Sequence, residues 1–92
     1  MRKIALITGA TSGIGKACAI KFAQNNYDII ITGRRKERLE DLEKELRVFG
    51  ADVLSLNFDV RNNQEVEQYL GNLSGKWQDI DLLINNAGLA AG

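Results

Sequence analysis

The sequence predicts an α/β fold, a doubly wound parallel sheet whose first four strands lie in the order 3-2-1-4. Four short apolar runs alternate along the chain with three segments of helical spacing. Parallel strands are joined by right-handed helical crossovers of about this length, so the alternation favours a parallel sheet. A glycine-rich turn follows the first apolar run directly and leads into the first helix. The 92 residues suffice for one domain of this kind.

The first strand is expected at residues 4–7, where four apolar residues in a row indicate burial on both faces of a sheet. Gly9, Gly13 and Gly15 follow, and helical spacing begins at Ile14. A helix that opens on a glycine turn offers free backbone N–H groups and the positive end of its dipole, with few Cβ atoms to keep a phosphate away. The turn therefore predicts a phosphate site, and a pyrophosphate is the expected guest.

The glycine spacing differs from two common phosphate loops. A P-loop requires a glycine five residues before Gly15 and a hydroxyl residue after Lys16, but Ala10 and Ala17 stand at these positions. The spacing G-x-x-x-G-x-G also differs from the G-x-G-x-x-G of many dinucleotide sites. A glycine turn with a purely structural role stays open as the alternative.

The next elements continue the alternation. A helix is expected over residues 14–25, ended by a pair of asparagines, and then a buried strand over residues 27–32. A second helix is expected over residues 36–49 and is ended by Gly50. The predicted inward face of the first helix consists of Ile14, Ala17, Cys18, Phe22 and Ala23. That of the second helix consists of Leu39, Leu42, Leu46 and Phe49.

The last elements are a strand, a helix and a strand. The third strand is expected at residues 53–58, and Asn62 with Glu65 forms a variant capping box that begins the third helix. The predicted inward residues of this helix are Val66, Tyr69, Leu70 and Leu73. The fourth strand is expected at residues 80–84, and the motif N-N-A-G follows it.

Composition argues against several classes of partner. Lys and Arg number 12, as do Asp and Glu, so the chain lacks the charge excess typical of proteins that bind nucleic acid or anionic membranes. We expect neither partner. Histidine is absent and Cys18 is the one cysteine, which excludes an internal disulfide and a cysteine metal cluster and favours a packed thiol. The N-terminus has no pattern of a signal peptide or membrane span, so a cytoplasmic protein is expected.

The motif T-G-x-x-x-G-x-G from Thr8 to Gly15, together with N-N-A-G from Asn85 to Gly88, resembles the short-chain dehydrogenases/reductases. The resemblance covers essentially all of the chain but only about the first third to half of a complete member of that family. It implies a Rossmann-type fold and hydride transfer between NADP(H) and a small hydroxy or carbonyl substrate. Residues 1–92 are then expected to form one NADP-binding segment of an enzyme that is a homo-oligomer in its full-length form.

The catalytic half is expected to be absent from this segment, which alone should be inactive. The family uses a Ser and a Tyr-x-x-x-Lys after the fourth strand. Here the residues four positions beyond Tyr27 and Tyr69 are Ile31 and Leu73, so neither tyrosine belongs to such a pair. No catalytic or metal-binding residue is therefore predicted in this chain.

The two motifs follow the first and fourth strands, between which a 3-2-1-4 sheet reverses its direction. Ligands of such sheets bind outside the carboxyl ends of the strands at this switch point, so the two motifs are expected to flank one crevice. The predicted cofactor-binding residues are Thr8, Gly9, Ala10, Thr11, Ser12, Gly13, Ile14, Gly15, Arg34, Arg35, Asp59, Val60, Asn86, Ala87 and Gly88.

The end of the second strand indicates which cofactor binds. NAD-binding folds commonly place a carboxylate there for the ribose hydroxyls, whereas an arginine accommodates the 2′-phosphate of NADP. Gly33 stands at the expected acidic position, and Arg34 and Arg35 follow. Guanidinium groups match phosphate in charge and geometry, so NADP is predicted. The alternative is a solvated pair of basic residues at the start of a helix.

The resemblance gives Asp59 a contact with the adenine and places Asn86 near the nicotinamide-side ribose. Asp59 as a turn or helix cap, and the asparagines as ties between strand ends, are the structural alternatives. The stretches at residues 32–39, 58–62 and 85–92 look like those of NADP-dependent 3-hydroxy acid dehydrogenases that oxidise serine and allo-threonine. A nucleotide-binding module without chemistry and a structural fragment are the competing interpretations of the whole chain.

Overall fold

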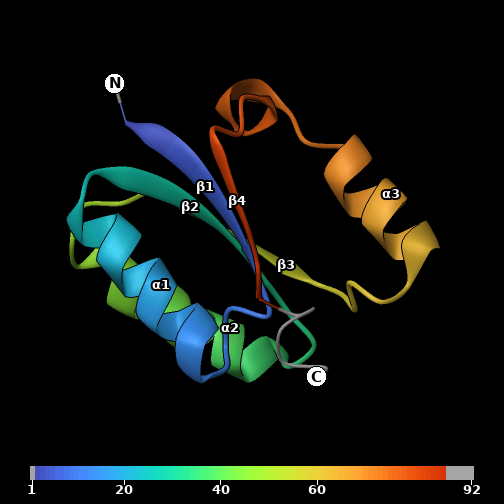
Figure 1. Cartoon of the computed structure of the whole chain (residues 1–92), viewed down its shortest axis with the longest axis horizontal. Helices are drawn as coiled ribbons and strands as arrows, with labels where there is room; N and C mark the ends of the chain where they lie inside the picture. Colours follow the sequence, from blue (N-terminus) through green and yellow to red (C-terminus); the bar gives the residue numbers. More distant parts are fainter. Residues whose placement is uncertain (1, 87–92) are drawn as a thin grey trace.

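The computed structural model describes residues 2–86 and contains one four-stranded parallel sheet. Its strands are β1 (Lys3–Thr8), β2 (Tyr27–Gly33), β3 (Val53–Asn57) and β4 (Leu82–Asn85). They lie in the order β3-β2-β1-β4, which confirms the predicted fold class (Figure 1). The carboxyl ends of the strands therefore meet at one edge of the sheet. The predicted site residues Ala87 and Gly88 lie outside the described residues.

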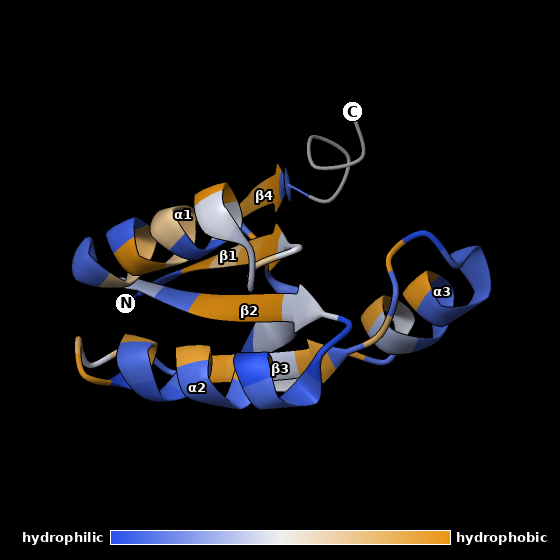
Figure 2. Cartoon of the chain, turned by 90° about the horizontal axis from the view of Figure 1, so that it is seen from below, coloured by the Kyte–Doolittle hydropathy of each residue, from blue (hydrophilic) through white to orange (hydrophobic). Residues whose placement is uncertain are grey.

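Two helices, α1 (Gly13–Gln24) and α2 (Lys36–Arg47), cover the same face of the sheet (Figure 1). An ion pair between Lys16 Nζ and Glu45 Oε2, 3.4 Å long, joins them. Between the helices and the sheet lies the larger hydrophobic cluster, to which β2 contributes Ile29 and Ile31. In Figure 2 the hydrophobic residues concentrate on the strands, whereas α2 is largely hydrophilic except where it faces the sheet. This face is the better-packed half of the molecule.

The buried side of α1 differs from the predicted one. Gly15, Ala19 and Ala23 are buried, at intervals of one helical turn, whereas Ile14 is 65% exposed and Ala17 is also exposed. The prediction was therefore wrong for these last two residues, right for Ala23, and partly right for Cys18 and Phe22, which are half-buried against the core. Small side chains on one face let a helix approach its neighbours closely, and that approach outweighed the simple apolar periodicity.

Helix α2 buries Leu39, Leu42 and Leu46 as predicted. It ends at Arg47, two residues earlier than expected, and Phe49 is 39% exposed. Gly50 has a φ of +83°, a conformation that residues with a side chain rarely adopt. The chain therefore turns away toward β3 at the predicted residue, although the helix itself stops sooner.

The opposite face of the sheet carries α3 (Asn63–Gly71) and a 3-10 helix, η1 (Gly75–Gln78). Here a small buried cluster of Ile4, Leu6 and Ile30 contacts half-buried residues, which include Leu70, Leu73 and Trp77. Helix α3 has no fully buried residue, and Figure 1 shows it projecting beyond the sheet. The predicted inward residues are thus only half-buried. Among the described residues, α3 and η1 therefore protect this face of the sheet from solvent less completely than α1 and α2 protect the other.

The start of α3 follows the sequence closely. The Asn62 side chain accepts hydrogen bonds from the backbone N–H groups of Gln64 (3.0 Å) and Glu65 (3.2 Å), which confirms it as the N-cap.

The sequence did not predict η1, and β4 begins at Leu82 rather than Ile80. None of the helices in residues 2–86 has the length and apolar character needed to span a membrane.

Candidate functional site

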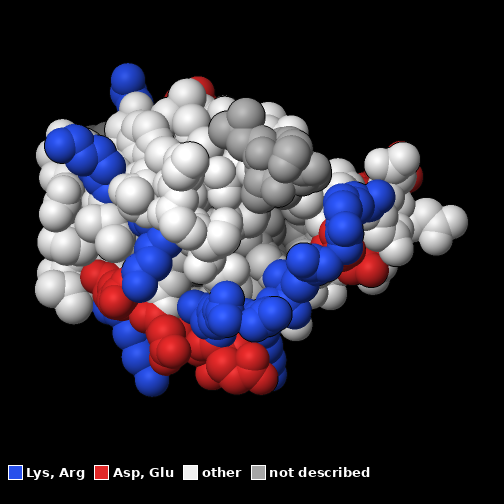
Figure 3. All heavy atoms as spheres, turned by 60° about the horizontal axis from the view of Figure 1, so that its bottom comes forward, with Lys and Arg blue, Asp and Glu red and all other residues white. Residues whose placement is uncertain are grey.

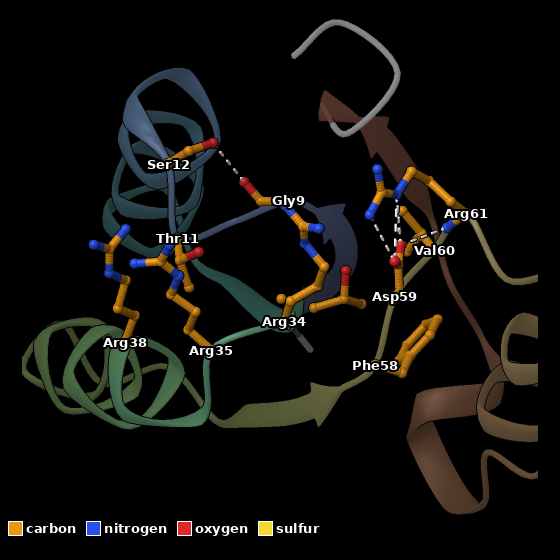
Figure 4. A pocket seen from close by; sticks show the side chains of 12 residues that line it. Gly9, Thr11, Ser12, Arg34, Arg35, Arg38, Phe58, Asp59, Val60 and Arg61 are labelled. Atoms are coloured by element: carbon orange, nitrogen blue, oxygen red, sulfur yellow. Dashed lines mark hydrogen bonds and ion pairs between the residues drawn. The ribbon is translucent and has the colours of Figure 1, made fainter. Parts of the chain in front are cut away.

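A cleft of about 320 Å³ lies at the carboxyl ends of the strands (Figure 4). It is bordered by the turn after β1, by the β2–α2 junction and by the segment after β3. Its lining residues are Gly9, Thr11, Ser12, Thr32, Gly33, Arg34, Arg35, Arg38, Phe58, Asp59, Val60 and Arg61. Seven of these are predicted cofactor-binding residues: Gly9, Thr11, Ser12, Arg34, Arg35, Asp59 and Val60.

The turn between β1 and α1 is fastened to the neighbouring strand. Gly9 has a φ of +60°, and the backbone N–H of the buried Ala10 donates to the carbonyl oxygen of Thr32 (3.0 Å). Ser12 precedes α1 but does not cap it, because its hydroxyl donates to the carbonyl oxygen of Gly9 (3.2 Å). The first backbone N–H groups of α1 are thus left without a side-chain cap from Ser12, in an orientation suited to an anion.

The glycines at the start of α1 differ in their surroundings. A Cβ added to Gly15 would lie 2.4 Å from the carbonyl oxygen of Gly9 and 2.7 Å from Nδ2 of Asn86. A Cβ added to Gly13 would meet no described atom within 4 Å. Packing within the protein therefore requires a glycine at position 15, while position 13 is open and leaves the backbone accessible to a ligand.

The fourth strand ends against this turn. Asn86 is 3% exposed, and its Nδ2 donates to the carbonyl oxygen of Gly9 (2.9 Å) and to Oγ of Ser12 (3.4 Å). Next to it, Oδ1 of Asn85 accepts a hydrogen bond from Oγ1 of Thr8 (2.9 Å). The two sequence motifs are therefore joined directly, and the asparagines tie the ends of neighbouring strands together. Ala10, Gly13, Ile14, Gly15, Thr8 and Asn86 support or adjoin the turn and do not line the cleft.

Three arginines border the cleft where β2 passes into α2. Arg34 follows the strand, Arg35 is the N-cap residue of α2, and Arg38 lies in its first turn. Figure 4 shows their side chains extending toward the turn that holds Gly9 and Thr11. None of the three forms an ion pair with residues 2–86. Arg38 was not among the residues predicted from the sequence, although it is a third arginine within four residues of Arg34.

Figure 3 shows a band of basic side chains on one side of the molecule, with acidic side chains beside it. Gly33, at the position where the resemblance puts an acidic residue, is buried. A Cβ there would lie 3.2 Å from Cγ2 of Thr11 and 3.3 Å from Cδ2 of Leu39, so a larger residue requires its neighbours to move. The cleft therefore has a cationic wall and little space for a carboxylate at this position.

The opposite wall contains one carboxylate, Asp59, held by Arg61. The guanidinium donates from Nη2 to Oδ2 (2.9 Å) and from Nε to Oδ1 (3.1 Å), and the backbone N–H of Arg61 donates to Oδ1 (2.9 Å). The Arg61 side chain, its backbone N–H and the charge of Arg34 together lower the pKa of Asp59 to about 2. Asp59 also accepts the N–H of Asn62 with its carbonyl oxygen (2.9 Å), so it has the structural turn role considered above. Arg61 was not among the residues predicted from the sequence.

One polar side chain in the cleft wall lacks a partner. Thr32 is fully buried, and its Oγ1 makes no hydrogen bond with the described residues. Buried hydroxyl groups normally have a partner, because an unsatisfied one costs about 1–3 kcal/mol.

Both tyrosines pack against other aromatic rings. Tyr27 packs edge-on against Phe22 with ring centroids 4.9 Å apart, and Tyr69 stacks on Phe58 at 4.7 Å. Neither tyrosine lines the cleft. Within residues 2–86, no three His, Cys, Asp or Glu side chains are grouped as metal ligands.

Several named dehydrogenases are similar to this chain in sequence. The chain is 48% identical over 89 residues to an NADP-dependent 3-hydroxy acid dehydrogenase of Salmonella typhi, a match that covers 97% of this chain and 35% of the relative. It is 46% identical over 87 residues to the serine 3-dehydrogenase of Rhizobium radiobacter, covering 95% of this chain and 34% of that protein. The chain thus spans about a third of the length of these relatives.

Solved structures share the fold. The L-sorbose reductase of Gluconobacter frateurii, complexed with NADPH and L-sorbose, superposes with a TM-score of 0.87 at 35% sequence identity. The match covers 95% of this chain and 34% of the reductase chain. The serine dehydrogenase of Escherichia coli superposes with a TM-score of 0.79 at 41% identity, over 87% of this chain and 36% of that one. The family model for short chain dehydrogenases matches residues 3–92. The sheet order, the glycine turn tied to Asn86 and these matches agree: the chain belongs to the short-chain dehydrogenase family.

Proposed function

We propose that this chain is the cofactor-binding segment of an NADP-dependent oxidoreductase that transfers hydride between NADP(H) and a small hydroxy or carbonyl substrate. The observation that carries the proposal is the set of three arginines, Arg34, Arg35 and Arg38, at the end of β2 without ion-pair partners among residues 2–86. Guanidinium groups at this point of the fold suit a 2′-phosphate.

The residues present fit the cofactor along the edge of the sheet. The uncapped start of α1 and the open backbone at Gly13 suit the pyrophosphate. Arg34 and its neighbours suit the 2′-phosphate, while Asp59 and Val60 line the part of the cleft nearest β3, which suits the adenine. Asn86, Ala87 and Gly88 are proposed to lie on the nicotinamide side, with Asn86 acting through the turn that it holds. Bound NADP(H) supplies or accepts the hydride.

The substrate assignment rests on the relatives. Several of them are named as dehydrogenases of 3-hydroxy acids or serine, which favours a small 3-hydroxy acid for the protein to which residues 1–92 contribute this segment. The cofactor site can be tested separately from the substrate. Isothermal titration of the chain with NADP⁺ and with NAD⁺ should show clearly tighter binding of NADP⁺, and equal or absent binding would overturn the assignment.

A nucleotide-binding module without chemistry is the second candidate. It is favoured by the packing roles of both tyrosines and by the lack of a Tyr-x-x-x-Lys in the sequence. We expect the chain by itself to bind NADPH without oxidising it in the presence of carbonyl compounds. Steady consumption of NADPH, followed at its absorbance band, would show that the chain has catalytic groups that this proposal denies.

A further inference from the structure

The cleft is lined by four arginines and one carboxylate, and only one of the four arginines forms an ion pair with that carboxylate. Arg61 holds both oxygens of Asp59, whereas Arg34, Arg35 and Arg38 have no ion-pair partner among residues 2–86. Arg34 and Asp59 line the same cleft, and the positive charge of Arg34 contributes to lowering the pKa of Asp59. The Asp59 carboxylate could therefore compete with a bound anion for Arg34. In this structure, however, Asp59 is already paired with Arg61.

We propose that Arg61 is a positioning residue for cofactor choice: by pairing with Asp59 it keeps this carboxylate away from Arg34 and so leaves Arg34 free for a 2′-phosphate. The inference rests on the proposed NADP site. It concerns a residue beyond the β2–α2 junction, on the opposite wall of the cleft (Figure 4).

The geometry suits this role. Three donor groups of one residue, Nη2, Nε and the backbone N–H of Arg61, bind one carboxylate and fix the direction of Asp59. The two residues are separated by only Val60, so the pair closes a short local ring with little loss of conformational freedom. If Arg61 were removed, Arg34 would be the cation whose charge still acts on Asp59.

A carboxylate released in this way would oppose the cofactor in two ways. It would form an ion pair with Arg34 that a phosphate must break, and its own charge would repel the phosphate. Both effects depend on the 2′-phosphate and should leave NAD⁺ largely unaffected. Because the Arg61 side chain is 67% exposed, solvent screens these effects, and they should be a few-fold in size.

The test is a double-mutant cycle on the full chain, read as the ratio of the dissociation constants of NAD⁺ and NADP⁺. Arg61→Ala should lower this ratio by about 2- to 5-fold at low ionic strength, and the loss should shrink as salt is added. In the background of Asp59→Asn, Arg61→Ala should leave the ratio unchanged, because no charged competitor remains. Using a ratio cancels any contact that Asp59 makes with the adenine common to both cofactors.

Each other outcome has a definite meaning. If Arg61→Ala reduced the NADP⁺ preference equally in the wild-type and the Asp59→Asn backgrounds, the inference would be overturned, because Arg61 would then bind the phosphate itself. An unchanged ratio in Arg61→Ala would overturn it as well. Far-UV circular dichroism and a urea melt verify that each variant is folded, and Arg61→Lys should restore part of the ratio. If the wild-type chain does not prefer NADP⁺, the proposed function fails, whereas a preference that Arg61→Ala leaves undiminished overturns only the role of Arg61.

Discussion

The side-chain amide of Asn86 donates a 2.9 Å hydrogen bond to the carbonyl oxygen of Gly9, and so joins residues 77 positions apart in the sequence. This bond connects the end of β4 to the turn between β1 and α1. It explains why Gly15 must lack a side chain, because a Cβ there would lie within 3 Å of both groups. The turn is thus shaped by three segments of the chain, and it is one border of the cleft.

The bond can be removed with little change of volume. In Asn86→Asp the donor becomes a charged acceptor that faces the carbonyl oxygen of Gly9. We expect the free energy of unfolding at neutral pH to fall by at least about 1–3 kcal/mol, the cost of an unsatisfied buried group. Urea melts of the variant and of Gln68→Glu, at an exposed glutamine of α3 whose side-chain amide makes no hydrogen bond with the described residues, measure the difference. Equal stabilities of the two variants would mean that the Asn86 bond does not hold the turn.

The two glycines of α1 provide a matched pair for separating folding from binding. Gly15→Ala should lower the free energy of unfolding by about 1–3 kcal/mol, because its Cβ meets backbone atoms that cannot move away easily. Gly13→Ala should keep or slightly raise stability, because its Cβ points into open space and alanine is the better helix former. It should nevertheless weaken NADP⁺ binding if the pyrophosphate approaches this backbone. Calorimetric titration and urea melts of both variants check this, and unchanged binding in Gly13→Ala would move the pyrophosphate elsewhere.

Cofactor preference should depend chiefly on Arg34. Charge-assisted hydrogen bonds to a 2′-phosphate imply that Arg34→Ala weakens NADPH binding by about 10- to 150-fold and leaves NADH binding nearly unchanged. The control is Lys44→Ala, at an exposed cation of α2 outside the cleft, which should alter neither affinity. Fluorescence titration of both cofactors measures the effect. An equal loss of affinity for NADH and NADPH would mean that Arg34 contacts a part common to both cofactors and does not bind the 2′-phosphate.

A charged cluster at the opposite end of the sheet should govern acid stability. Asp28, whose side chain is 6% exposed, accepts hydrogen bonds from Nε of Arg2 (2.8 Å), the N–H of Asp52 (2.9 Å) and Nζ of Lys76 (3.0 Å). Burial acts to raise the pKa of Asp28, but these three groups outweigh it and the pKa lies below its ordinary value. The Asp28 carboxylate therefore binds a proton less readily in the folded protein than in the unfolded chain. Its contribution to the free energy of unfolding is complete above about pH 4–5 and disappears as the pH falls through the pKa of the folded state.

Asp28→Asn should accordingly lower the free energy of unfolding at pH 7 by about 2–3 kcal/mol. The difference from wild type should shrink on acidification to about pH 3 and below, because the wild-type carboxylate is then progressively protonated. Glu40→Gln is the control, since Glu40 is exposed and makes no ion pair with the described residues. Urea melts at several pH values measure the dependence. A difference that stays constant with pH would assign Asp28 a purely steric role.

The edge of the sheet predicts association of the chain with itself. Within residues 2–86, β4 is an outermost strand, and its Leu83 is 58% exposed. Such an edge offers backbone groups and apolar side chains for pairing with another strand, so we expect dimers or larger species at micromolar concentrations. Leu83→Lys should shift sedimentation toward monomer, whereas Val48→Lys, at an 80% exposed residue outside the strands, should not. A wild-type chain that sediments as one monomeric species would contradict the expectation.

Much of the fold and part of the site followed from the sequence alone. Unbroken apolar runs such as Ile29 to Ile31 indicate strands buried on both faces, and Asn62 and Gly50 indicate where local geometry must change. These features are local, because each depends on the preferences of a few neighbouring residues. The strand order followed from the doubly wound arrangement expected for alternating strands and helices, and the position of Arg34 followed from the end of β2.

Tertiary structure decided what depends on distant segments. Which face of α1 is buried was determined by its close approach to the sheet, so Ala19 is buried and Ile14 is exposed. The need for glycine at position 15 arises from Asn86, which no local pattern around the turn reveals. The pairing of Arg61 with Asp59, which leaves Arg34 without an ion-pair partner among the described residues, depends likewise on how the segment after β3 lies across the cleft from the β2–α2 junction. Sequence periodicity reports on one element at a time, whereas close packing and charge pairing are set by the elements that meet in space.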